Sequence, residues 1–168
     1  MKFPNPPRGI KALPWKLPIL VYRLGLGWLL GKRFLLLEHT GRKTGKLRRA
    51  VLEVISSTPE ENVYYVVSGF GTGSNWYRNI LQQPQVTIQL GRHRYQATAK
   101  QLPPQQASEL MVRYEKEHPA SLKALSSLLG YEFEQTTEGI REFGRQIPVI
   151  QFTARTPDHE RKPDKQDY

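Results

Sequence analysis

The chain has 168 residues and no cysteine, which predicts a single domain with a buried core and excludes disulfides, thiolate metal sites and cysteine nucleophiles. Its formal net charge is +10, and Glu38 is the only acidic residue in the strongly basic stretch that ends at Arg49. A field of this sign attracts an anionic partner, which leaves nucleic acid, an acidic membrane surface and a phosphorylated small molecule as the classes to separate.

Two segments precede the first predicted strand. Residues 1–13 are proline-rich, show no signal-peptide pattern and are predicted to form an irregular arm. Residues 14–30, "PWKLPILVYRLGLGWLL", are apolar but are interrupted by Lys16 and Arg23, so this stretch is too short and broken for a membrane span. It predicts a helix that either covers the core or lies on a bilayer surface.

Apolar runs and alternating patterns then predict a series of short strands and helices. Strands are expected at 34–38, 49–56, 63–68, 85–90, 93–100 and 147–153, with a hairpin turn at Gly91–Arg92. Helices are expected at 75–82, with Asn75 as the N-cap, and at 105–117, 121–129 and 137–143. This order predicts an α+β fold, an antiparallel barrel or sandwich over 14–154, followed by a charged and flexible tail at 155–168.

A glycine-containing basic turn, "HTGRKTGKLRR", follows the first strand. Its glycine N–H groups can form a concave nest for an anion, and the surrounding cations add charge and bidentate geometry. Such a turn suits a compact anion better than a long duplex, while nucleic-acid binding and a merely solvated turn remain open.

The second informative stretch is "SGFGTGSNWYRN". Its glycines allow a ligand to approach the backbone, and Ser68 leaves a buried strand where its hydroxyl could reach a heterocycle. Trp76 offers a flat face for a ring, whereas Tyr77 is predicted to be a core anchor of the short helix. The four histidines show no ligand spacing, so no metal site is predicted.

The segments "LLLEHTGRKTGKLRR", "VYYVVSGFGTGSNWYRNI", "QPQVTIQLGRHRYQATA" and "RQIPVIQF", in this order, resemble the deazaflavin-dependent nitroreductase family. The similarity covers about 35–99 and the closing strand. It implies a split β-barrel related to flavin-binding split barrels. It also implies an oxidoreductase that transfers hydride from reduced coenzyme F-420, whose tail carries a phosphodiester and glutamates, to a quinone, an enone or a nitro compound.

The resemblance also assigns site residues. The positions that match the family's tail-binding turn are Gly41, Arg42, Lys43, Thr44, Gly45 and Arg48, and those beside the deazaflavin are Ser68, Trp76 and Asn79. The helices at 105–129 correspond to the wall beside the acceptor, which offers mainly Leu122, Ala124, Leu125 and Leu128. His118 is the isolated polar group of this wall and the candidate catalytic residue, with a purely structural helix-end histidine before Pro119 as the alternative. Two departures are Val51, where the family usually has proline, and "KEHPASLKALSSLL", which lacks the tyrosines of the nitroimidazole-activating relatives.

Several alternatives accompany this interpretation. A flavin mononucleotide-binding split barrel is the second choice, because one phosphate could also sit near Arg48. A basic nucleic-acid-binding module is the third. The predicted location is cytoplasmic, while membrane contact through 14–30 and a homodimer are left open.

Overall fold

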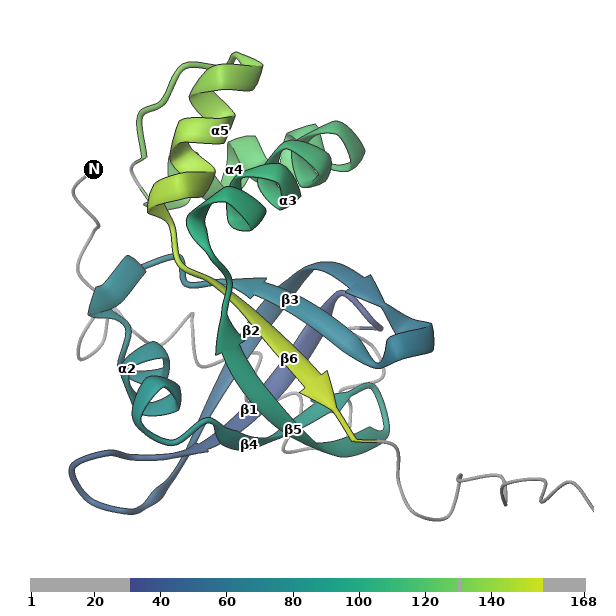
Figure 1. Ribbon diagram of the computed structural model, residues 1–168, viewed down its shortest axis with the longest axis vertical. Coiled ribbons are helices and arrows are strands. Elements are labelled where there is room, and N and C mark those ends of the chain that lie inside the picture. Colours follow the sequence, from purple (N-terminus) through teal and green to yellow (C-terminus); the bar gives the residue numbers. More distant parts are fainter. Residues whose placement is uncertain (1–30, 130, 156–168) are drawn as a thin grey trace, which may run out of the picture.

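The computed structural model describes residues 31–129 and 131–155. The predicted arm at 1–13, the predicted helix at 14–30 and nearly all of the predicted tail at 155–168 lie outside this part, and the limits of the single predicted domain stay predictions. Six antiparallel strands close into a barrel in the order β1-β2-β3-β6-β5-β4. Three helices stand together over one end of the barrel, and a fourth, α2, lies beside it (Figure 1). The predicted α+β split-barrel class is confirmed.

The strands are β1 (Phe34–Thr40), β2 (Leu47–Thr58), β3 (Val63–Val67), β4 (Gln85–Leu90), β5 (His93–Gln101) and β6 (Val149–Ala154). The helices are α2 (Asn75–Gln82), α3 (Pro104–Glu117), α4 (Pro119–Leu129) and α5 (Thr137–Gln146), with single turns η3 (Pro59–Glu61) and η4 (Gly71–Gly73). Every predicted element within the described residues is present. β1 and β2 extend further into the basic stretch than expected, because their pairing continues to Thr40 and Leu47 whatever the polarity of the side chains. The N-cap of α2 is Ser74 instead of Asn75.

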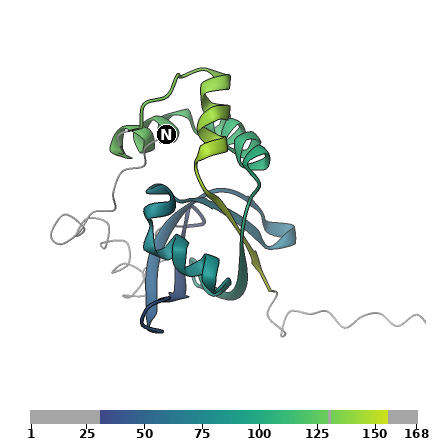
Figure 2. The ribbon, with the colours of Figure 1, turned by 60° about the vertical axis from the view of Figure 1, so that its left-hand side comes forward.

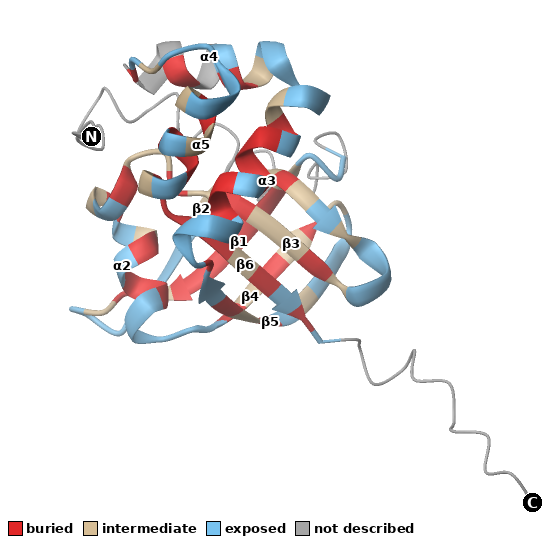
Figure 3. Cartoon of the chain, turned by 45° about the horizontal axis from the view of Figure 1, so that its top comes forward, coloured by how far each residue is buried: buried red, intermediate tan, exposed pale blue. Residues whose placement is uncertain are grey.

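The barrel interior is a continuous apolar core. Alternate residues of β1, Leu35 and Leu37, point inward and meet residues such as Ile88 and Phe152 of other strands. Helix α2 adds its buried Tyr77 and Ile80 to the same core. Figure 3 shows buried positions recurring along the strands and on parts of the helices. The amphipathic α2 is therefore fixed against the barrel, which confirms Tyr77 as a core anchor.

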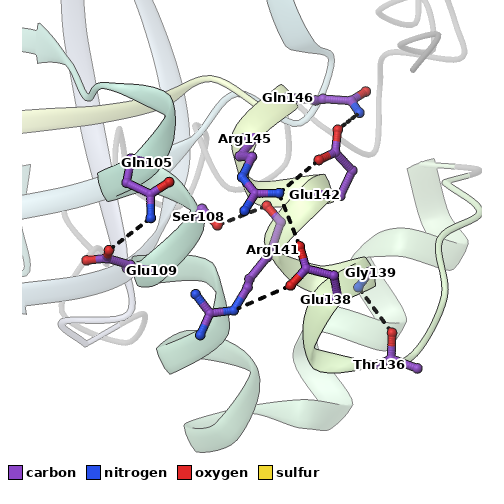
Figure 4. Close-up of polar contacts among 10 residues, drawn as sticks. All are labelled: Gln105, Ser108, Glu109, Thr136, Glu138, Gly139, Arg141, Glu142, Arg145 and Gln146. Atoms are coloured by element: carbon purple, nitrogen blue, oxygen red, sulfur yellow. Dashed lines mark hydrogen bonds and ion pairs between the residues drawn. The ribbon is translucent and has the colours of Figure 1, made fainter.

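A second core lies between the barrel and helices α3, α4 and α5. The contact between α3 and α5 is close: the Ser108 hydroxyl donates to the Arg141 carbonyl at 3.0 Å, and a Cβ on Gly144 would lie 2.7 Å from Ser108 Cα. Figure 4 shows this contact beside the exposed ion pairs of α5. Because exposed pairs contribute little, the close packing matters more for the stability of this layer than the charges do.

Candidate cofactor-binding site

The basic turn between β1 and β2 is closed by its own backbone. The Gly41 N–H donates to Lys46 O at 2.8 Å, and the N–H groups of Thr44 and Gly45 donate to Gly41 O at 3.1 and 2.7 Å. Gly45 has a φ of +66°, a left-handed conformation that glycine adopts without strain. The expected nest of free glycine N–H groups is therefore not found in this turn, because these groups are used to close it.

The cations of the turn divide into two groups. In the first group, Arg49 Nε lies 2.8 Å from Oε1 of the buried Glu38, a carboxylate that Arg94 of β5 also contacts, and Arg42 is bonded to Asn79 of α2. The side chains of the second group are exposed and make no hydrogen bond or ion pair within 31–129 and 131–155; they are Lys43, Lys46 and Arg48. We refer to these three residues as the free cations. They are available for an anionic ligand.

The adjacent residues Arg48 and Arg49 of β2 lie on opposite faces of the sheet. Arg48 lies opposite His39 and Arg49 opposite Glu38 in the β1–β2 register. Successive side chains of a strand point to opposite faces, so Arg48 shares the face of His39 and α2, whereas Arg49 shares that of Glu38. A Cβ on Gly41 would lie 3.2 Å from Lys46 O and from Thr44 Oγ1, and at an ordinary contact distance of 3.5 Å from Arg48 Cγ. The absence of a side chain at Gly41 thus lets the turn close tightly, with the stem of Arg48 beside it.

Helix α2 is joined to the turn through one buried amide. Asn79 Oδ1 accepts hydrogen bonds from the Arg42 backbone N–H at 3.2 Å and from Arg42 Nη1 at 2.8 Å, and Asn79 Nδ2 lies 3.1 Å from His39 Nδ1. Asn75 adds longer contacts to the Arg42 guanidinium. His39 and Asn79 are each only 4% exposed. Figure 2 shows α2 beside the hairpin that carries the turn.

His39 is an uncharged partner in this arrangement. Burial lowers its pKa, the Arg48 charge lowers the pKa further, and a hydrogen bond with the Thr40 backbone opposes the shift. Asn79 Oδ1 already accepts from Arg42, so Asn79 Nδ2 is the group that faces His39. The His39 Nδ1 must therefore accept this hydrogen bond, which places the ring proton on Nε2. The sequence offered no reason to select His39.

Ser68 is enclosed at the end of β3. Its side chain is 0% exposed, and its hydroxyl lies 2.7 Å from Gly71 O and 2.9 Å from Ser74 Oγ. Its backbone N–H donates to Pro148 O at 2.9 Å. The contact of this hydroxyl with a heterocycle stays a prediction, and in this structure the hydroxyl is bonded within the glycine loop. Because each polar group of Ser68 has a partner, the residue shapes the glycine loop from within.

Two aromatic residues border the glycine loop. Trp76 is half-buried against the barrel core, so part of its indole remains accessible. Its ring lies edge-on to that of Tyr77, with the ring centroids 6.3 Å apart. Tyr131, after α4, donates its hydroxyl to Gly69 O at 2.5 Å and packs edge-on against Phe143. Burial raises the pKa of Tyr131. Sequence reasoning missed Tyr131 because it lies outside the periodic helical segments.

His118 connects α3 to α4. Its N–H donates to Tyr114 O at 2.8 Å, its carbonyl accepts from Ser121 and Leu122, and its exposed ring lies 5.3 Å from the Tyr114 ring. Leu122, predicted beside the acceptor, is buried in the helical core. These contacts give both residues a structural role at the helix junction.

His118 also lies away from the basic turn. The Tyr114 hydroxyl, close to His118, donates to Glu53, and Glu53 lies opposite Phe34 at the start of β1. The turn follows Thr40 at the other end of that strand, about 20 Å away at the usual rise per residue. The structure therefore joins the turn to Asn79 of α2, the helix that also carries Trp76, and leaves His118 outside this group.

Two further properties of the described part of the chain concern membranes and metals. Within 31–129 and 131–155, no helix is long and apolar enough to cross a membrane. The same residues contain no cluster of three or more potential His, Asp or Glu metal ligands.

The six-stranded antiparallel barrel has the architecture of a split-barrel protein. Its free cations lie on a closed turn that is joined to α2, the helix that carries the half-buried Trp76. The model of the family "F420H(2)-dependent quinone reductase" matches residues 23–125, and the chain belongs to this family. Membership confirms the resemblance to deazaflavin-dependent oxidoreductases and identifies reduced coenzyme F-420 as the cofactor of the family.

Three known proteins illustrate the relationship. The chain is 40% identical over 74 residues to "Putative F420H(2)-dependent quinone reductase Rv3178" of Mycobacterium tuberculosis, an alignment that covers 43% of this chain and 60% of that protein. A solved structure described as a domain-swapped dimer has a TM-score of 0.52 and 20% identity, over 83% of this chain and 98% of that chain. The conserved hypothetical protein Rv2991 from the same bacterium has a TM-score of 0.51 and 11% identity, over 80% of both chains. The two structures show the fold alone.

Proposed function

We propose that the chain is an oxidoreductase that transfers hydride from reduced coenzyme F-420 to an electrophilic acceptor. The observation that carries the proposal is the set of free cations, Lys43, Lys46 and Arg48, on one closed turn beside α2. Three unpaired positive charges on a preorganised turn suit a ligand with several negative charges. Family membership supports the deazaflavin coenzyme, with its phosphodiester and glutamate tail, over flavin mononucleotide or nucleic acid.

The proposed roles of the site residues follow from their contacts. The free cations would hold the anionic tail, and the accessible part of Trp76 would lie against the deazaflavin. The backbone of Gly41, Thr44 and Gly45 would keep the turn closed, Arg42 and Asn79 would fix it to α2, and Ser68 would shape the glycine loop. The bound coenzyme supplies the hydride, and the protein binds and orients it. A quinone is the first acceptor to test, with enones and nitro compounds as further candidates.

Removal of the anionic tail tests this proposal most directly. We expect saturable binding of coenzyme F-420 by fluorescence titration, and at least about tenfold weaker binding of a deazaflavin that lacks the phosphodiester and glutamates, since hydrogen bonds to charged groups contribute about 1.5–3 kcal/mol each. The affinity for the complete coenzyme should fall with salt, whereas that for the tail-less compound should not. Equal affinities for the two compounds, or no binding of either, would contradict the proposal. A protein purified with stoichiometric flavin would instead support flavin mononucleotide.

His118→Ala tests the candidate catalytic side chain. We expect turnover and cofactor affinity to stay within about twofold of the wild type, because the exposed ring contacts Tyr114 at a helix junction and lies away from the turn. Steady-state kinetics with a quinone would measure both. A loss of turnover of roughly ten- to a thousandfold with unchanged cofactor affinity would assign His118 to polarisation of the acceptor.

A further inference from the structure

We propose that His39 is a positioning residue of the cofactor site, which acts through Asn79 to hold Arg42 and thereby keeps the basic turn docked on α2. The inference rests on the proposed function, because it concerns how the same site is prepared for an anionic ligand. It assigns a role to a buried side chain that is itself only 4% exposed.

The hydrogen bonds of Asn79 permit one orientation of its amide. Asn79 Oδ1 accepts hydrogen bonds from two groups of Arg42, the backbone N–H and Nη1. The N–H groups of Asn79 Nδ2 must therefore donate to another acceptor. The acceptor within reach is His39 Nδ1, at 3.1 Å. Both side chains are almost fully buried, and a lost acceptor would leave the Asn79 N–H group unsatisfied away from water. His39 therefore selects the amide orientation that binds Arg42.

Arg42 joins the turn to helix α2. Its backbone N–H and its guanidinium both bond α2, and the free cations follow it within six residues along the chain. If this attachment is lost, the turn that carries Lys43 and Lys46 keeps its own backbone bonds but is no longer fixed against α2. Its position must then be fixed when the ligand binds, and the cost of this ordering lowers the affinity. The consequence is a fall in affinity although none of the three free cations has changed.

Protonation of His39 would disrupt the same contact. Imidazolium donates from both nitrogens, so its Nδ1 could no longer accept from Asn79, and a turned amide would lose both bonds from Arg42. The charged group that faces His39 from β2 is Arg48; from α2 the facing group is the Asn79 amide. The nearby carboxylate, Glu38, points to the opposite face and is paired with Arg49 and Arg94.

The sign of the pH effect separates this role from simple electrostatics. A positive charge on His39 would by itself attract an anionic tail more strongly, so electrostatics alone predicts that affinity rises on acidification. The positioning role predicts that affinity falls. Burial opposes the charged form of His39, so the fall should begin below the ordinary imidazole range, as the pH drops under about 6.5.

The experiment is a set of fluorescence titrations with coenzyme F-420 between about pH 7.5 and 5.5. We expect the affinity of the wild type to fall progressively on acidification as the His39 ring becomes protonated. In His39→Asn the side-chain oxygen replaces Nδ1 as a non-titrating acceptor, so affinity should be near that of the wild type at neutral pH and should not fall in acid. His39→Leu, similar in size but without an acceptor, should bind roughly tenfold more weakly at neutral pH. His93→Asn, at an exposed histidine of β5, controls for unrelated titration and should behave as the wild type.

A ligand-free measurement completes the test. In NMR spectra of the wild type, the Arg42 amide and the Asn79 side-chain amide should shift with pH at the same midpoint as the His39 ring. Three results would overturn this inference alone. They are an unchanged affinity in His39→Leu, a wild-type affinity that rises in acid, and an Arg42 amide resonance whose shift does not follow the titration of the His39 ring. A wild type that does not bind the coenzyme would overturn the proposed function and this inference with it.

Discussion

Arg48→Glu is expected to weaken the binding of coenzyme F-420 by roughly a hundredfold or more. Arg48 is an exposed, unpaired cation whose stem lies beside Gly41, on the face of the hairpin that it shares with His39 and α2. Loss of a charge-assisted hydrogen bond costs about 1.5–3 kcal/mol, and the new carboxylate adds repulsion toward the anionic tail. Fluorescence titration of the purified variant measures the change.

Lys100→Glu is the matched control for this substitution. It changes the net charge by the same amount at an exposed position of β5, opposite Gln151 of β6, without touching the turn. We expect its cofactor affinity to stay within about threefold of the wild type at physiological salt, because distant exposed charges are screened. If both variants lose affinity equally, binding depends on the overall charge of the protein and the turn is not the site.

Gly144→Val is expected to lower the free energy of unfolding by about 3 kcal/mol or more. A Cβ at this position would lie 2.7 Å from Ser108 Cα and 3.1 Å from Met111 Cβ, atoms of the facing helix α3 that cannot move aside without separating the helices. Overpacking of a core typically costs 1–3 kcal/mol, and branching at Cβ adds strain within a helix. Thermal and urea unfolding would measure the loss.

Two further variants grade this effect. Gly144→Ala should be destabilising but less so, since it adds one methyl group at the same contact. Lys116→Val, at an exposed position of α3, should cost only the difference in helix propensity, below about 1 kcal/mol. If Gly144→Val is as stable as Lys116→Val, the separation of α3 and α5 adjusts easily and the close contact contributes little.

Much of the fold followed from local patterns in the sequence. Alternation and β-branched residues predicted the strands, the Gly91–Arg92 turn was recognised from its glycine, and α2 was predicted with its observed limits. These features depend on neighbours in the chain, through side-chain period and backbone conformation, so they can be read without a tertiary structure. The family could likewise be recognised, because its two motifs are continuous in the sequence.

The role of each side chain depended on contacts between distant segments. Arg48 and Arg49 are identical neighbours, yet register places one beside α2 and the other against Glu38, which Arg94 reaches from 56 residues away. His39 acquires its role from Asn79, which lies 40 residues further along the chain. Residue type and spacing determined where positive charge is concentrated. Only the closed barrel, by setting strand register and placing α2 against β1, decided which charges are consumed within the fold and which remain free for a ligand.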